Sequence, residues 1–186
     1  MATNSGVQWV AKFPTSVKTS DLANPFRTNF EAFQQAMKNA GITVKITASL
    51  RPPERAYLMH YSWMIVNGQI KPADVPPLPA LRGANIIWNH AHAMKGAQEM
   101  VDGYGIGGLL VPPSLKSRHI EGRAIDTVLS WDGDISVQAK DGLFKDIIGT
   151  SRNATHPGLI AAGATYGVIH FKPASSDKVH WSDDGH

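Results

Sequence analysis

The sequence predicts a fold of the α+β class, because segments with helical spacing and segments with strand alternation follow one another along the chain. Large apolar side chains recur at helical spacing from Phe26 to Met37, which predicts an amphipathic helix. Pro25 suits the first position of this helix, which is expected to end near Gly41. Residues 42–48 then alternate apolar and polar side chains and include β-branched residues, which predicts a half-buried strand.

Further elements are predicted along the rest of the chain. Helices are expected from Arg55 to about Val66, from about His90 to Asp102 with an end at Gly103, at 144–148 and at 157–164. Strands are expected at 124–130 and 167–171, and the first of them presents Asp126 from a rigid element. Residues 68–83 are rich in proline, which predicts a long surface loop that could line a substrate cleft.

Length and composition favour one self-sufficient domain, and we expect a single domain over residues 1–186. The formal net charge is only +3 and the basic residues are scattered, so a nucleic-acid partner is not indicated. The lack of cysteine excludes disulfides and thiol catalysis. The first ten residues lack the features of a secretory signal, and no run approaches the roughly 18 apolar residues of a membrane span. We therefore expect a chain without a membrane span that begins in the cytoplasm.

Histidine and aspartate residues give the strongest functional signal. Residues 117–126 read S-R-H-I-E-G-R-A-I-D, and residues 177–181 read D-K-V-H-W. The side chains of His119, Asp126 and His180 are nitrogen and oxygen ligands of the kind that suit catalytic zinc, which keeps its fourth position for water. We therefore expect one catalytic Zn²⁺ ion. The alternative is that the three residues occur separately, as surface or capping residues.

Two further charged residues could take part in hydrolysis at such a site. Asp177 lies three residues before His180 and is the expected general base, which takes a proton from water and passes it to the leaving amine. Arg51 is the expected electrophilic group, because a guanidinium can stabilise an oxyanion or bind a carboxylate through two hydrogen bonds. The alternatives are a solvated loop aspartate for Asp177 and a helix-end ion pair for Arg51.

The remaining polar residues are less informative. His90 and His92 are expected in the first turn of the helix that follows them. His170 could lie in the core or beside the metal ligands. The aspartate and histidine side chains at 183–186 could bind a second cation, although a charged chain end is usually solvated.

The pattern S-x-H-x-x-G-x-A-x-D with a later D-x-x-H-W resembles the D-alanyl-D-alanine carboxypeptidase family of zinc metallopeptidases, and within it the phage endolysin-like L-alanyl-D-glutamate peptidases. The resemblance extends over most of the chain, from residues 13–16 to the last residues. It implies a hedgehog/DD-peptidase-like fold, in which helices pack against a small antiparallel sheet. It also implies specific roles: zinc ligands His119, Asp126 and His180, general base Asp177, transition-state stabilisation by Arg51, and substrate binding by Ser117 and Arg51.

The substrate that the resemblance implies is the stem peptide of peptidoglycan. Family members that act on D-Ala-D-Ala ends usually carry Glu at the position of Asp177, whereas endolysin-like members often carry Asp. We therefore expect an L-alanyl-D-glutamate endopeptidase that acts as a phage-type endolysin. The alternatives are a D-Ala-D-Ala carboxypeptidase and a zinc-containing binding module without catalysis, as in signalling proteins of the hedgehog type.

Partners and location are expected to match this function. The predicted partner is peptidoglycan, and the predicted state is a monomer. Without a signal peptide, such an enzyme would stay in the cytoplasm and act on the cell wall after release, passing from the host cytoplasm to the periplasm if it is phage-encoded.

Overall fold

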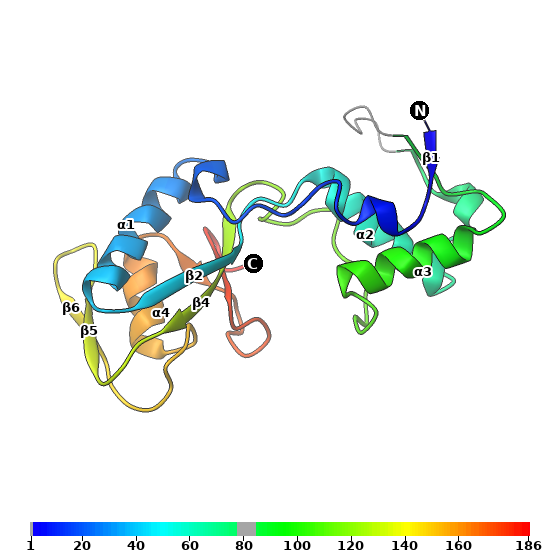
Figure 1. Ribbon diagram of the computed structural model, residues 1–186. Helices are drawn as coiled ribbons and strands as arrows, with labels where there is room; N and C mark the ends of the chain where they lie inside the picture. The colour runs from blue at the N-terminus through cyan, green and yellow to red at the C-terminus, as the bar shows by residue number, and fades with distance from the viewer. Residues whose placement is uncertain (1, 78–84) are drawn as a thin grey trace. The chain divides into compact units, whose positions relative to one another are not determined.

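The structure, a computed structural model, describes residues 2–77 and 85–186 (Figure 1). Two compact units make up the chain: unit 1 comprises Met1–Thr15 and Arg51–Lys116, and unit 2 comprises Ser16–Leu50 and Ser117–His186. The single domain predicted over residues 1–186 stays a prediction, because units defined by contacts do not report cooperative unfolding.

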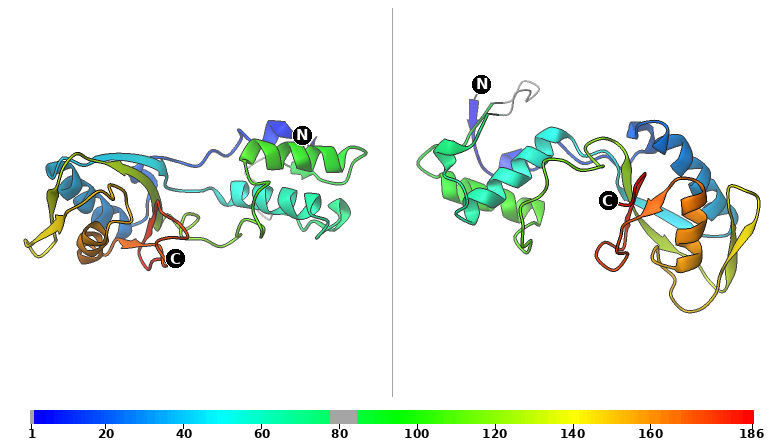
Figure 2. Two further views of the ribbon diagram at one scale, coloured as in Figure 1. Left: turned by 90° about the horizontal axis from the view of Figure 1, so that it is seen from below. Right: turned by 180° about the vertical axis from the view of Figure 1, so that it is seen from behind.

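Unit 2 is built on a four-stranded antiparallel sheet with the strand order β2-β4-β8-β7. Its strands are β2 (Thr43–Ala48), β4 (Ala124–Ser130), β8 (His180–Ser182) and β7 (Ile169–His170). The other elements are helices α1 (Phe26–Asn39) and α4 (Pro157–Thr165), the 3-10 helix η2 (Thr19–Asp21), and the hairpin of β5 (Ile135–Gln138) with β6 (Phe144–Ile147). Helices α1 and α4 lie on the same side of the sheet (Figure 2). This arrangement confirms the α+β class.

Large apolar side chains of α1, α4 and the sheet form one buried core in unit 2. The four helical positions that the sequence marks on α1 are at most 1% exposed: Phe26, Phe30, Phe33 and Met37. The ring of Phe33 meets the ring of Trp181 edge-on, with 5.5 Å between the ring centroids. Burial of one such side chain stabilises a fold by about 1.5–3 kcal/mol. The core therefore holds α1 against β8.

The alternation of side chains along β4 and β8 separates this core from the other face of the sheet. Ile125 and Leu129 of β4 join the core, as does Trp181 of β8. Because neighbouring residues of a strand point to opposite faces, Asp126 and His180 point away from the core. The register pairs Asp126 with His180 across the two strands. Strand pairing thus places two of the predicted metal ligands side by side.

Unit 1 is mainly helical. Its helices α2 (Pro53–Val66) and α3 (Ala93–Tyr104) pack against each other. Short elements complete it: the 3-10 helices η1 (Val7–Trp9) and η3 (Pro72–Asp74), and the parallel strands β1 (Ala2–Asn4) and β3 (Asn85–Ile87). The buried side chains of Trp9, Leu58 and Met100 lie at the centre of its largest apolar cluster. Within the described ranges, no helix is long and apolar enough to cross a membrane.

The helix predicted over residues 144–148 is wrong, because this segment forms strand β6. The side chain of Ile147 is buried, whereas those of Phe144 and Asp146 are exposed. Pairing with β5 supplies the backbone hydrogen bonds that decide the conformation. A partner strand of this kind overrides local preference, and the sequence of the segment does not reveal it.

The predicted end of α3 also needs correction, since the helix continues through Gly103 to Tyr104. Gly103 has a packing role: a Cβ there would lie 2.6 Å from Cγ2 of Val10. Gly105, with a φ of 67°, is the residue that ends the helix in the left-handed conformation. The proline-rich loop predicted over residues 68–83 lies partly outside the described residues.

Gly163→Ala should destabilise the protein, although alanine is normally the better helix former. A Cβ at this position of α4 would lie 2.9 Å from Cζ3 of Trp181 and 2.9 Å from the carbonyl oxygen of Val168. We expect the free energy of unfolding, measured by urea denaturation, to fall by about 1–3 kcal/mol. Gly108→Ala is the control, because a Cβ there meets no atom within 4 Å. Equal stability of the two variants would contradict the close packing of α4 on β8.

Candidate metal centre

His119 lies on a tight turn that leads into β4. The backbone N–H of Arg123 donates to the carbonyl oxygen of Arg118 at 2.8 Å and closes the turn. Gly122 has a φ of +69°, and a Cβ there would lie 3.0 Å from the backbone nitrogen of Ala23. Both the left-handed backbone and the lack of space favour glycine at this position. The turn therefore holds His119 at a defined place ahead of β4.

The structure brings together the three side chains predicted as metal ligands. Nε2 of His119 lies 3.1 Å from Oδ1 of Asp126 and 3.2 Å from Nδ1 of His180, and the last two atoms are 3.2 Å apart. The His119 and His180 residues are buried, with 4% and 7% of their surfaces exposed. The turn, strand β4 and strand β8 each contribute one of these side chains.

Two backbone oxygens set the proton positions on the histidine rings. Nδ1 of His119 lies 2.7 Å from the carbonyl oxygen of Ser49, and Nε2 of His180 lies 3.2 Å from the backbone oxygen of His186. Because such an oxygen only accepts hydrogen bonds, each of these ring nitrogens carries a proton and donates it. In the neutral rings, the opposite nitrogens therefore present lone pairs, and both face Asp126.

Two imidazole lone pairs and one carboxylate oxygen thus converge, and this group could hold a metal ion. A tetrahedral zinc ion with bonds of about 2.0–2.1 Å separates its ligand atoms by roughly 3.3 Å. An octahedral iron ion bound by two histidines and one carboxylate on one face separates them by about 3.0 Å. The observed distances of 3.1 and 3.2 Å suit both metals. The spacing therefore supports a metal site without selecting the metal.

The close approach of these groups shifts the pKa values of Asp126 and His180. Burial alone would raise the pKa of Asp126, but the hydrogen bonds that His119 and His180 donate in their protonated form, together with their positive charges, outweigh burial and hold this pKa well below its usual range. Burial alone would lower the pKa of His180, but the hydrogen bond and charge of Asp126 outweigh it and raise this pKa. The charge of Asp177 adds to the increase. A proton and a metal ion therefore compete for His180.

The structure places Asp177 in the loop before β8, where its side chain is half-buried. Its Oδ1 accepts the backbone N–H of Val179 at 3.3 Å. Among the described residues, the candidate ligand group does not include Asp177, although the charge of Asp177 acts on His180. Its role as a general base stays a prediction.

The other two predicted site residues lie in different units. Ser117 belongs to unit 2, and its buried Oγ has no hydrogen-bond partner within the described structure. A buried hydroxyl of this kind is one that a bound substrate could satisfy. Arg51 is half-buried and belongs to unit 1, so its role at ligands in unit 2 stays a prediction.

Sequence analysis missed the arginines that flank the His119 turn. Arg118 forms an ion pair with Asp184, and Arg123 forms one with Asp183. The two aspartates that were considered for a second cation therefore have guanidinium partners. No sequence signal reveals these pairs, because their members lie far apart along the chain. The arginines occupy unspecified positions of the metal-binding pattern, and the aspartates lie outside it.

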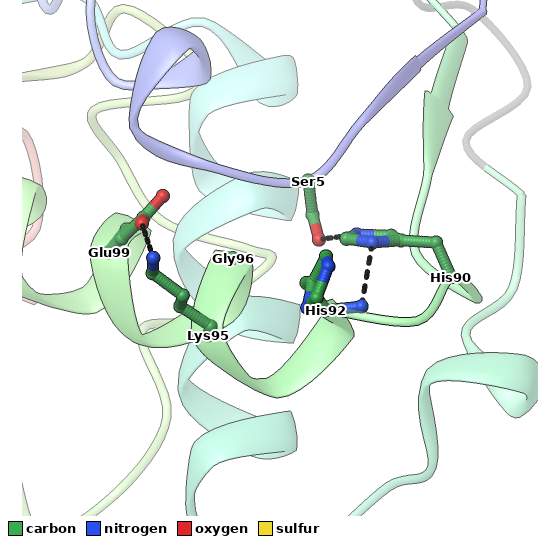
Figure 3. A pocket seen from close by; sticks show the side chains of 6 residues that line it. All are labelled: Ser5, His90, His92, Lys95, Gly96 and Glu99. Carbon is green, nitrogen blue, oxygen red and sulfur yellow. Dashed lines mark hydrogen bonds and ion pairs between the residues drawn. The ribbon is translucent and has the colours of Figure 1, made fainter.

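A polar pocket lies in unit 1 (Figure 3), and its lining residues are Ser5, His90, His92, Lys95, Gly96 and Glu99. Nε2 of His90 lies 2.9 Å from Oγ of Ser5, as in a serine and histidine pair that could act in catalysis. However, Nδ1 of His90 accepts the backbone N–H of His92 at 3.3 Å. In the neutral ring, Nε2 therefore carries the proton and donates to Ser5, so it cannot act as the base that activates a nucleophile. The pair joins the chain after β1 to the start of α3.

Comparisons with models of known protein families, with curated proteins and with solved structures found no match to this chain. The family resemblance therefore rests on the motif residues.

The affinity for zinc should fall as the pH decreases, because a proton and the metal compete for Nδ1 of His180. The pKa of His180 is raised, so competition begins above 6.5, the ordinary value for histidine. Below the pKa, we expect a loss of about tenfold in affinity for each pH unit. Competition with a chromophoric chelator from about pH 5 to about pH 8 measures this dependence. His92→Gln should keep the same profile, and an affinity independent of pH would contradict the assigned ligand.

Proposed function

We propose that this chain is a zinc-dependent hydrolase of peptidoglycan stem peptides, and specifically an L-alanyl-D-glutamate endopeptidase of the phage endolysin type. The observation that carries the proposal is the convergence of two imidazole lone pairs and one carboxylate oxygen within 3.2 Å of one another. Three protein ligands leave a coordination position for water, as in catalytic zinc sites. The motif resemblance supports zinc over iron and supports the stem peptide as substrate.

The residues of the metal centre have distinct tasks in this proposal. His119, Asp126 and His180 would hold the zinc ion. When bound, zinc acts as a Lewis acid that polarises a carbonyl group and lowers the pKa of water from 15.7 to about 7. The hydrogen bonds to Ser49 and His186 keep the two rings in the orientation that binding requires. The ligands therefore need little rearrangement to bind the metal.

Asp177 would move the proton during hydrolysis. It takes a proton from the attacking water and passes it to the amine that leaves when the peptide bond breaks. Two observations support this role: the charge of Asp177 acts on His180, and the backbone N–H of Val179 holds its carboxylate. Both observations favour a general base over a freely solvated loop aspartate.

Ser117 and Arg51 would bind the substrate. The unpartnered hydroxyl of Ser117 lies two residues before His119. It could donate a hydrogen bond to a carbonyl group of the substrate or accept one from a peptide N–H. Arg51 would bind a substrate carboxylate or stabilise the developing oxyanion through its guanidinium group. The first role favours a stem peptide, which carries free carboxylates.

The proposal extends to fold, partner and location. The sheet of unit 2, with both helices on one side and Asp126 and His180 on the other, supports a hedgehog/DD-peptidase-like fold. Peptidoglycan is the proposed macromolecular partner of a monomeric enzyme. The enzyme would accumulate in the cytoplasm and act on the wall after release.

Asp177→Ala should abolish most of the peptidase activity and leave zinc binding intact, because the aspartate moves a proton and is not a ligand. We expect a decrease of about 10²–10⁴-fold in kcat, which is the usual contribution of a general base. The measurement uses zinc-loaded protein with purified peptidoglycan and synthetic stem peptides, and mass spectrometry identifies the new ends. Zinc content is determined on the same samples.

Asp141→Ala is the matched control for this experiment. Asp141 is an exposed loop aspartate of unit 2 whose Oδ1 accepts the backbone N–H of Leu143, just as Asp177 accepts that of Val179. Full activity of Asp177→Ala would exclude its role as the base. Release of terminal D-Ala alone would identify a carboxypeptidase, and stoichiometric zinc without any cleavage would identify a binding module.

A further inference from the structure

Charged side chains around the metal ligands form a network to which the proposed function assigns no role. Arg118 and Arg123 flank the His119 turn, and Asp183 and Asp184 follow β8. Nε of Arg118 lies 2.9 Å from Oδ2 of Asp184, and its Nη2 contacts the same oxygen. Nε of Arg123 lies 2.5 Å from Oδ2 of Asp183. Each arginine thus hydrogen-bonds one aspartate through its guanidinium group.

Glu121 joins the two pairs into one network. Its Oε2 lies 2.7 Å from Nη1 of Arg118 and 3.4 Å from Nη1 of Arg123. Nε of Arg118 also lies 3.7 Å from Oδ1 of Asp183. The hydrogen bonds from Arg118 lower the pKa of Asp184 to about 2, so this carboxylate keeps its charge at neutral pH. The network therefore alternates two cations with three anions.

This network joins the two chain segments that carry the histidine ligands. The turn at residues 118–123 carries His119, and the strand that ends just before Asp183 carries His180. The two histidines are 61 residues apart in sequence. At the same junction, the backbone N–H of Asp183 donates to the carbonyl oxygen of Arg123 at 3.3 Å. A backbone hydrogen bond and charged side chains therefore both connect the His119 turn to the end of β8.

The effect of the network should fall on the metal site more than on overall stability. The paired side chains are between 22% and 45% exposed, and a single ion pair with such exposure adds little to the stability of a fold, because solvent screens the charges. When both rings are neutral, in contrast, the ligand atoms present lone pairs to one another at 3.1–3.2 Å and repel unless a proton or a metal ion lies between them. Contacts that hold the turn against the end of β8 oppose this repulsion.

We infer that Arg118, Arg123, Asp183 and Asp184 are positioning residues that hold the His119 turn and the end of β8 together, so that the metal ligands are assembled before the metal binds. The inference rests on the metal site of the proposed function. These residues act through the backbone of the two segments, and Arg118 has the central place because it contacts Glu121, Asp183 and Asp184.

Arg118→Gln should weaken zinc binding by about tenfold, the lower end of the range for residues that support metal ligands. The affinity is measured by chelator competition on folded protein, and thermal unfolding of the metal-free protein is followed in parallel by circular dichroism. High salt should weaken zinc binding to the parent protein more than to Arg118→Gln, because salt screens the network. Asp184→Asn should behave similarly, and the double variant should lose less than the sum of both.

Arg27→Gln is the matched control. This change breaks an ion pair between Arg27 and Glu31, whose side chains are about as exposed as those of the network. Both residues lie on α1, which carries no metal ligand. Its zinc affinity should equal that of the parent. Arg118→Lys keeps the positive charge and should have a zinc affinity between those of Arg118→Gln and the parent. If Arg118→Gln does not fold, Arg118→Lys is compared with the parent instead.

The outcomes separate this inference from the proposed function. Equal zinc affinities of the parent, Arg118→Gln and Arg118→Lys would exclude a positioning role while leaving a metal-dependent hydrolase intact. Weaker binding by Arg118→Gln without any peptidase activity in the parent would support the positioning role and exclude the hydrolase. A parent protein that binds no metal would exclude both.

Discussion

Two backbone oxygens determine what the metal centre can bind. Because the oxygens of Ser49 and His186 accept the ring protons of the two histidines, the lone pairs of the opposite nitrogens face Asp126. With the other tautomer, an N–H group would point into the centre and repel a cation. The fold of unit 2 has to bring these two oxygens, the His119 turn and β8 to the same place, and the sheet pairing does so.

Neighbouring residues of β8 connect this centre to the core. Trp181 packs against Phe33 and above Gly163 on one side of the sheet, while His180 points to the other side. The indole N–H of Trp181 also donates to Oγ1 of Thr127 at 3.1 Å, which ties β8 to β4. Core packing on one face of the sheet therefore fixes the position of a ligand on the other face.

The parts that could be predicted from sequence have local signals. Helix α1 and strand β4 follow from apolar spacing, and the ligands follow from a histidine and aspartate pattern with few other structural uses. Strand β6 could not be predicted, because its conformation depends on pairing with β5. The pairing of Arg118 with Asp184 spans 66 residues, and charged residues are too common for such a contact to leave a pattern.

The hydrogen bond from His119 to Ser49 has a further consequence for how this chain can vary. The first segment of unit 2 ends at Leu50, and its second segment begins at Ser117. The hydrogen bond therefore joins Ser49 and His119, which lie next to the two points where the chain passes between the units. The intervening segment, Arg51–Lys116, is therefore an insertion between two parts of unit 2, and it forms unit 1 together with Met1–Thr15. Loop-closure entropy grows only slowly with length. Insertions or deletions in the segment, far from Ser49 and His119, should therefore leave the orientation of the His119 ring unchanged.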